Sequence, residues 1–220
     1  MNLHPGVNGF DFQVERWVNG IAGHVAVLDV FGVVLAKFAP EIWAAIFLAL
    51  WFWPPYHRTR ARRAVIYAVV AGVLALVINV AVSHLAPYRP RPFVLEPHRV
   101  HQLVQHARDS AFPSDHAAGS FGFAIGLLSA GLLDGVMALG LAVAVAWGRV
   151  FVGLHWATDV LFGALVGTAA GLAVLRARKR LEWLVDGIFW SLRVPDAKAA
   201  RGGPPPAVCA AESDDHAPPR

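Results

Sequence analysis

The chain has 220 residues, of which 56% are hydrophobic and 15% are charged, and its mean hydropathy is +0.50. Soluble domains carry about 25% charged residues, so this composition excludes a disordered chain and an ordinary cytosolic enzyme. The formal net charge of +4 comes from short basic clusters between apolar runs, which is typical of membrane-orientation signals. We therefore expect no nucleic-acid partner. A single cysteine, Cys209, permits no internal disulfide.

The apolar stretches predict an all-α fold, a polytopic membrane bundle of five or six transmembrane helices. Residues 10–18 are amphipathic and are expected to lie on the membrane surface. Residues 21–38 are apolar but contain His24, Asp29 and Lys37. Each ionisable group costs about 2.5 kcal/mol or more inside the bilayer, so a sixth span and an interfacial helix are equally consistent. Five further stretches approach the length of about 20 residues that a span needs. They are residues 40–53, 64–82, 117–133, 136–151 and 156–175.

The basic clusters predict the orientation of these spans. Residues 57–63 and 176–180 are rich in arginine and lysine, which favours the cytoplasmic side for both. With alternating spans between them, residues 83–116 and 150–159 then lie together on the extracytoplasmic side. This shared side is the central structural expectation.

The two ends of the chain carry different signals. The N-terminus has no positively charged region followed by a short apolar core and a cleavage site, so no cleavable signal peptide is expected. From Pro195 onward the sequence is rich in proline, alanine, glycine and charge. Such a segment cannot bury enough apolar surface to become ordered. We expect a membrane-embedded domain over residues 1–194 and a disordered cytoplasmic tail over residues 195–220.

Three segments of this mainly apolar chain are rich in polar residues. They are residues 84–93, 112–116 and 148–159. Each segment alone has a simple structural explanation. Arginines beside a span anchor at lipid headgroups, Pro-Ser-Asp before an apolar run is a helix N-cap, and a His-x3-Asp pair is often just a hydrogen-bonded helix pair. All three segments, however, fall on the same predicted membrane face. Together they supply arginines, histidines, a hydroxyl and a carboxylate.

This set of residues suits the chemistry of a phosphate group. Arg91 and Arg149 are permanent cations with planar donor forks that match phosphate oxygens. Ser114 lies at a predicted helix N-terminus, where unpaired backbone N–H groups and the helix dipole favour anions. The sequence therefore predicts an anion site at these residues.

A nucleophile is available beside the predicted anion site. His155 and Asp159 are four residues apart, so they share one helix face, where the carboxylate can bind one ring nitrogen and leave the other free to attack. His116 is a second imidazole for general acid–base work. On one continuous helix Arg149 would point roughly 240° away from His155. A break near Gly153 removes this conflict and predicts a helical hairpin there.

A metal site is the obvious alternative. Its candidate ligands are His98, His101, His106 and Asp109. No pair among them has the close spacing of a recognised zinc motif. We therefore expect neither a metal nor another cofactor.

At these residues the chain resembles the type 2 phosphatidic acid phosphatase superfamily, whose signature is Lys-x6-Arg-Pro, Pro-Ser-Gly-His and Ser-Arg-x5-His-x3-Asp. Here Arg91-Pro92, Pro113-Ser114-x-His116 and Arg149-x5-His155-x3-Asp159 match. The segment 89–116 is similar to the bacitracin-resistance undecaprenyl-diphosphate phosphatases within that superfamily.

The resemblance implies roles for the matching residues. His155 would be the nucleophile and form a phosphohistidine, Asp159 would orient it, and His116 would be the general acid. Arg91, Ser114 and Arg149 would hold the phosphoryl group, with the backbone of residues 114–116 assisting. The family needs no metal.

The resemblance also implies a reaction and a place for it. The chain would remove the terminal phosphate of undecaprenyl diphosphate, a polyprenyl lipid in the bilayer, on the extracytoplasmic face of a bacterial inner membrane. The product would re-enter the cell-wall carrier cycle. A phosphatase acting on phosphatidate or phosphatidylglycerol phosphate would use the same site, and a lipid-binding or transport protein without catalysis is the alternative from another class.

Three positions depart from the superfamily pattern. His84 stands where the superfamily has lysine, and as a substrate-binding residue it would replace a fixed cation with a titratable one. Gly148 replaces the serine and loses a hydroxyl donor. Asp115 replaces glycine and puts a carboxylate at the substrate-binding site, where it would repel an anion unless it turns away or pairs with an arginine.

Overall fold

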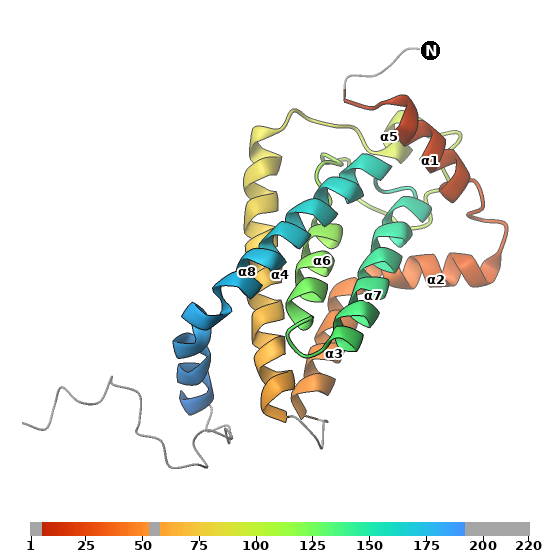
Figure 1. The fold of residues 1–220 in the computed structure, drawn as a ribbon. Coiled ribbons are helices and arrows are strands. Elements are labelled where there is room, and N and C mark those ends of the chain that lie inside the picture. Colours follow the sequence, from red (N-terminus) through yellow and green to blue (C-terminus); the bar gives the residue numbers. More distant parts are fainter. Residues whose placement is uncertain (1–5, 53–57, 192–220) are drawn as a thin grey trace, which may run out of the picture. The chain divides into compact units, whose positions relative to one another are not determined.

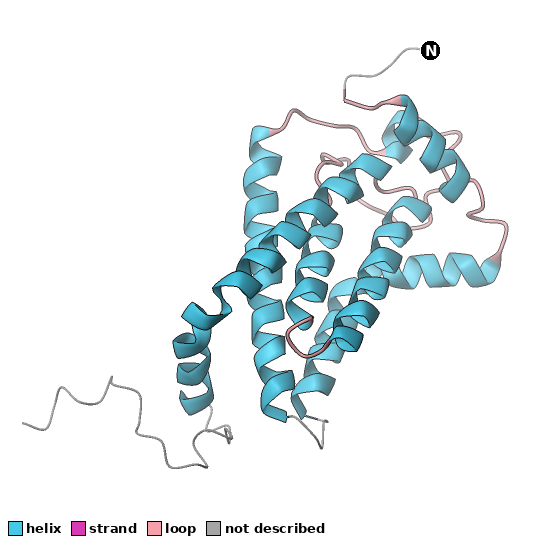
Figure 2. Cartoon of the chain, in the orientation of Figure 1, coloured by secondary structure: helices cyan, strands magenta, loops and turns pink. Residues whose placement is uncertain are grey.

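A computed structural model describes residues 6–52 and 58–191 of the chain (Figure 1). All regular structure in these ranges is helical (Figure 2). The helices are α1 (Gly9–Asn19), α2 (Ala26–Lys37), α3 (Ala39–Phe52), α4 (Arg58–Leu85), α5 (Pro92–Leu95), α6 (Asp115–Leu127), α7 (Leu132–Phe151) and α8 (Ala157–Ser191). The predicted all-α membrane bundle is confirmed.

The number of spans depends on whether α2 and α3 are counted as one broken span. In the described part of the chain, three helices are long and apolar enough to cross a membrane, in Thr59–Leu85, Leu132–Phe151 and Ala157–Ser191. A fourth span results if α2 and α3, which are bent by 74°, form one broken span. Helix α6 was expected to cross as part of residues 117–133, but its 13 residues extend only about 20 Å. A hydrocarbon core is about 30 Å thick. The chain is a multi-pass membrane protein.

The bend between α2 and α3 follows from Pro40, in the first turn of α3. A proline ring clashes with the carbonyl of the residue four positions earlier and has no N–H to donate to it. A helix continuing from α2 would lose this hydrogen bond at Ala36, and α2 ends at Lys37. Within residues 21–38, which were ambiguous in the sequence, Ala26–Lys37 therefore form a separate helix set at a steep angle to the next one.

Helix α6 packs between its neighbours through small residues. It contacts α4 and α7, and a Cβ atom added at Gly126 would lie 2.4 Å from the Cα atom of Ala68 in α4. Helix α8 approaches α6 as closely, since a Cβ at Gly167 would lie 2.2 Å from the carbonyl oxygen of Ala118. Lipid tails are as apolar as leucine, so close van der Waals packing between small residues is a main source of helix association in membranes.

The amphipathic helix predicted over residues 10–18 is present as α1. Its polar side faces inward: Asp11, Glu15 and Asn19, spaced along one face of the helix, are buried. Trp17 on the other side is 70% exposed. The sequence pattern therefore located the helix, but the polar face is turned toward the protein and not toward water.

The chain divides into two compact units, residues 1–177 and 178–220. The first unit holds every residue of the predicted site. In the second unit the structure describes the continuation of α8 to Ser191. The predicted domain boundary and the predicted tail, residues 195–220, lie outside the described residues.

The close approach of α8 to α6 gives a stability prediction. Gly167→Ala should lower the free energy of unfolding by about 1–3 kcal/mol, because the new methyl group meets backbone atoms that cannot move aside. The matched control is Gly140→Ala in α7, where a Cβ atom meets nothing within 4 Å. Thermal unfolding in detergent should show a lower melting temperature for the first variant only. Equal melting temperatures would contradict this packing.

Candidate active site

The three polar segments meet at one end of the first unit. The predicted break near Gly153 is confirmed, because α7 ends at Phe151 and α8 begins at Ala157. Gly153 has a φ of +77°, and a Cβ there would lie 2.6 Å from Cγ1 of Val100. Glycine alone suits a left-handed position with so little space. The turn brings Nη2 of Arg149 within 3.2 Å of Nε2 of His155.

The imidazole of His155 is buried and held on both sides. Its Nδ1 lies 2.8 Å from the carbonyl oxygen of Ala111, and because a carbonyl only accepts, Nδ1 carries the proton. Its Nε2 lies 3.2 Å from Nη1 of Arg91 and 3.2 Å from Nη2 of Arg149. Burial, then the charges of Arg149 and Arg91, hold the pKa of His155 well below its ordinary value. The ring is therefore neutral, with the Nε2 lone pair directed at the two guanidinium groups.

Arg91 is fixed by a full set of acceptors. Its Nε donates to Oδ1 of Asp109 at 2.8 Å, Nη1 to the carbonyl of Leu154 at 2.9 Å, and Nη2 to the carbonyl of Ser110 at 3.2 Å. Although its modest burial raises the pKa of Asp109, the hydrogen bond and charge of Arg91 outweigh this and hold it below its ordinary value. Asp109 therefore stays ionised and orients Arg91. The sequence offered Asp109 as a candidate metal ligand and did not assign it a contact with Arg91.

Arg149 is fixed by the broken helix. Its Nη1 donates to the carbonyl of Ala36 at 2.9 Å. This is the carbonyl that Pro40 leaves without an N–H donor. The Nε atom of Arg149 is buried and has no hydrogen-bond partner in the described part of the chain. That donor is available for an oxyanion.

Ser114 occupies the N-cap position of α6, as its sequence context suggested, but it does not act as a side-chain cap. Its side chain is fully buried, and its Oγ has no partner among the described residues. A buried hydroxyl is normally hydrogen-bonded, since leaving it unpaired costs about 1–3 kcal/mol. An unpaired hydroxyl at a helix N-terminus is suited to donate to a bound anion.

Asp159 does not hydrogen-bond to His155 in this structure. Its Oδ2 lies 3.7 Å from Nδ1 and accepts the N–H of Trp156 at 2.8 Å. Asp159 was expected to bind Nδ1, but the carbonyl of Ala111 accepts that hydrogen bond instead. A backbone carbonyl has no signal in the sequence, so this contact could not be found there.

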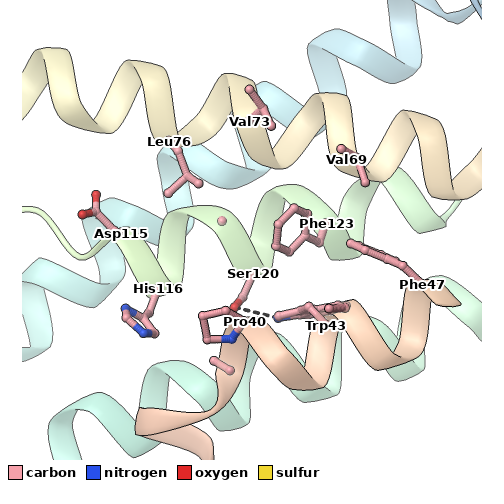
Figure 3. A pocket seen from close by; sticks show the side chains of 13 residues that line it. Pro40, Trp43, Phe47, Val69, Val73, Leu76, Asp115, His116, Ser120 and Phe123 are labelled. Carbon is pink, nitrogen blue, oxygen red and sulfur yellow. Dashed lines mark hydrogen bonds between the residues drawn. The ribbon is translucent and has the colours of Figure 1, made fainter.

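His116 and Asp115 project from the first turn of α6 to different sides (Figure 3). His116 is half-buried and lines a pocket of about 440 Å³. Asp115 is exposed and accepts a hydrogen bond from Nδ2 of Asn79 at 2.6 Å. The carboxylate is therefore tied to α4, although it lines the same pocket as His116. The other lining residues are mainly apolar, from α3, α4 and α6, among them Trp43, Phe47, Val73, Leu76 and Phe123.

The structure leaves His84 outside this cluster. Its side chain is exposed in the last turn of α4, and no contact joins it to Arg91 or His155 in the described ranges. Among the candidate metal ligands, His106 and Asp109 lie close together, with Nδ1 of His106 3.5 Å from Oδ1 of Asp109. In the described ranges no such contact joins them to His98 or His101. Within residues 6–52 and 58–191, no three His, Cys, Asp or Glu side chains are grouped to hold a metal ion.

The chain is similar to known proteins in sequence and in fold. Residues 63–183 match the model of the PAP2 superfamily. The chain belongs to the PAP2 superfamily. The undecaprenyl-diphosphatase BcrC of Bacillus subtilis (strain 168) is 32% identical over 176 residues, which cover 80% of this chain and 88% of that protein. The bacitracin transport permease protein BcrC of Bacillus licheniformis is 31% identical, over 77% of this chain and 81% of that protein. The crystal structure of Aquifex aeolicus LpxE has the same fold, with a TM-score of 0.64 at 22% identity, over 79% of this chain and 99% of that chain.

The unpaired hydroxyl gives a prediction that separates binding from folding. Ser114→Ala should lower phosphate release by about 10²-fold, the usual cost of losing one donor to a developing oxyanion. Its melting temperature should not fall, because the hydroxyl has no partner to lose among the described residues. Ser120→Ala in the same helix is the control, since Oγ of Ser120 accepts the indole N–H of Trp43 at 2.9 Å and its loss should lower the melting temperature. A destabilised Ser114→Ala protein would contradict this assignment.

Proposed function

We propose that this PAP2 protein hydrolyses undecaprenyl diphosphate to undecaprenyl phosphate and phosphate through a phosphohistidine at His155. The observation that carries the proposal is the position of Nε2, which lies between the guanidinium groups of Arg91 and Arg149 while Nδ1 is bonded to a carbonyl. A neutral imidazole with its lone pair in a cationic pocket is a nucleophile directed at a phosphoryl group. The name of the B. subtilis relative supports the choice of lipid.

The reaction takes place in two displacements. In the first, Nε2 of His155 attacks the terminal phosphorus and the bond to the bridging oxygen breaks, so that undecaprenyl phosphate leaves. Arg91, Arg149 and Ser114 neutralise the charge on the phosphoryl oxygens, which is where most catalysis of phosphoryl transfer originates. In the second, water attacks the phosphohistidine and releases phosphate, and His155 is regenerated.

The other two catalytic residues are His116, which transfers protons, and Asp159, which stabilises charge. His116 donates a proton to the leaving oxygen and then takes one from the attacking water. Asp159, with Oδ2 at 3.7 Å from Nδ1, stabilises the positive charge that the ring acquires as the new bond forms. The pocket beside His116 is apolar and suits the prenyl end of the leaving group.

The charge pattern supports an extracytoplasmic site in a bacterial cell membrane. Arg60 and Arg62 lie in the first turns of α4, whereas Asp115, next to His116, contacts Asn79 nearer the other end of that helix. The 28 residues of α4 extend about 42 Å, enough to cross a bilayer. Arginines near span ends favour the cytoplasm. The membrane-embedded domain over residues 1–194 and a cytoplasmic tail over residues 195–220 belong to this proposal.

Phosphate release by the purified protein in detergent with EDTA tests the proposal. Undecaprenyl diphosphate, phosphatidate and phosphatidylglycerol phosphate are offered at matched concentrations. We expect EDTA-resistant release from the prenyl diphosphate, reduced at least about 10³-fold by His155→Ala. His84→Ala is the matched control and should retain release near the wild-type rate, because His84 is exposed away from the cluster. Preference for a glycerolipid would discard the cell-wall substrate, and no release at all would favour a binding or transport protein.

The role of His116 predicts a difference between substrates. A diphosphate expels a phosphate ester, whose second ionisation lies near pH ~6 by analogy with phosphorylated side chains. A phosphate monoester expels a far more basic alkoxide, which needs the proton of a general acid. His116→Ala should therefore impair monoester hydrolysis much more than diphosphate hydrolysis, measured as kcat on the two substrates. Equal losses would remove His116 from this role.

A further inference from the structure

A buried ion-pair network lies behind Asp159, and its cation is a residue that the superfamily signature does not include. Arg89 is 7% exposed and pairs with Oδ1 of Asp159 through Nη1. Its Nη2 lies 2.5 Å from Oδ2 of Asp11 in α1. Two buried carboxylates therefore share one guanidinium group. Because the group is buried, these charges act on their surroundings with little screening by solvent.

Helix α1 also holds both arms of the turn that carries the nucleophile. On the α8 side, Oδ1 of Asp11 accepts the backbone N–H of Thr158 at 2.9 Å and its hydroxyl at 2.8 Å. On the α7 side, Nδ2 of Asn19 donates to the carbonyl of Phe151 at 2.8 Å. His155 lies between these two anchors. Helix α1 precedes the residues matched by the family, 63–183.

The network engages the carboxylate that lies beside Nδ1 of His155. Oδ2 of Asp159 faces Nδ1 of the ring at 3.7 Å, while its Oδ1 is engaged by Arg89. Asp11 and Asp159 bind different nitrogens of the same guanidinium group. Removing the charge of Asp11 leaves Arg89 wholly to Asp159, and removing that of Arg89 leaves the two carboxylates uncompensated.

We propose that Asp11 and Arg89 are positioning residues that set the charge Asp159 presents to His155 and thereby tune the nucleophile. This inference rests on the proposed phosphatase reaction and adds α1 to its machinery. The other charged groups around the ring are Arg91 and Arg149 at Nε2, with Asp109 on Arg91, and His116, Asp115 and His106 nearby. They are the same in every variant below, so a change between variants reports the network.

The test is the acid limb of kcat/KM for lipid diphosphate hydrolysis, which follows protonation of the free nucleophile. Asp11→Asn removes a negative charge, disfavours the imidazolium and should move the limb to lower pH. Arg89→Gln removes a positive charge and should move it to higher pH, each by about one unit. The double variant has the net charge of the wild type, so its limb should return toward the wild-type position.

Asn19→Ala is the matched control, because it removes the other anchor of α1 without changing charge. It should lower kcat and leave the acid limb in place. If Arg89→Gln does not fold, the comparison of Asp11→Asn with Asn19→Ala still decides. The inference would be overturned if the acid limb of Asp11→Asn did not move, or if it moved in the same direction in both charge variants. In either case an active wild type would still uphold the proposed function. A wild type inactive on every lipid phosphate would overturn the proposed function itself.

Discussion

Two arginine side chains must remain charged in a nearly dry site beside a neutral imidazole, and the rest of the site depends on meeting that requirement. Arg91 and Arg149 are each 4% exposed. A buried charge is costly unless hydrogen bonds replace its water. Carbonyls and the carboxylate of Asp109 satisfy Arg91, and the carbonyl of Ala36 holds Arg149. Nε of Arg149 and the hydroxyl of Ser114 have no partner within residues 6–52 and 58–191. They leave room for one more acceptor, which is a phosphoryl group in the proposed reaction.

The membrane context explains how such a polar site is supported. The helices that carry the site residues approach one another through glycine and alanine, so their backbones lie close and rigidly placed. Pro40 breaks the path from α2 to α3 and frees the carbonyl that Arg149 binds. The carbonyl freed by this helix irregularity is thus compensated by the side chain of Arg149.

Behind the nucleophile, α1 adds an electrostatic layer made from residues outside the matched family region. Its inward face is polar because it meets Arg89 and the backbone at the α7–α8 turn, not lipid or solvent. An amphipathic sequence is equally compatible with lying on a membrane and with covering a polar site. Only the neighbours of the helix distinguish these two uses.

The sequence by itself determined the helical membrane fold, the three polar segments and the break at Gly153, because apolar runs, signature spacing and helical period are all local properties. It also predicted that Arg149 and His155 meet, since a continuous helix would have separated them. Only the tertiary structure decided that Ala111 holds His155, that Arg89 and not His84 is buried behind the site, and that Asp115 is tied to Asn79. These contacts join residues far apart in the chain, and one of them uses a backbone carbonyl, which every residue type carries. Their partners follow from how the helices pack, and no local pattern records that.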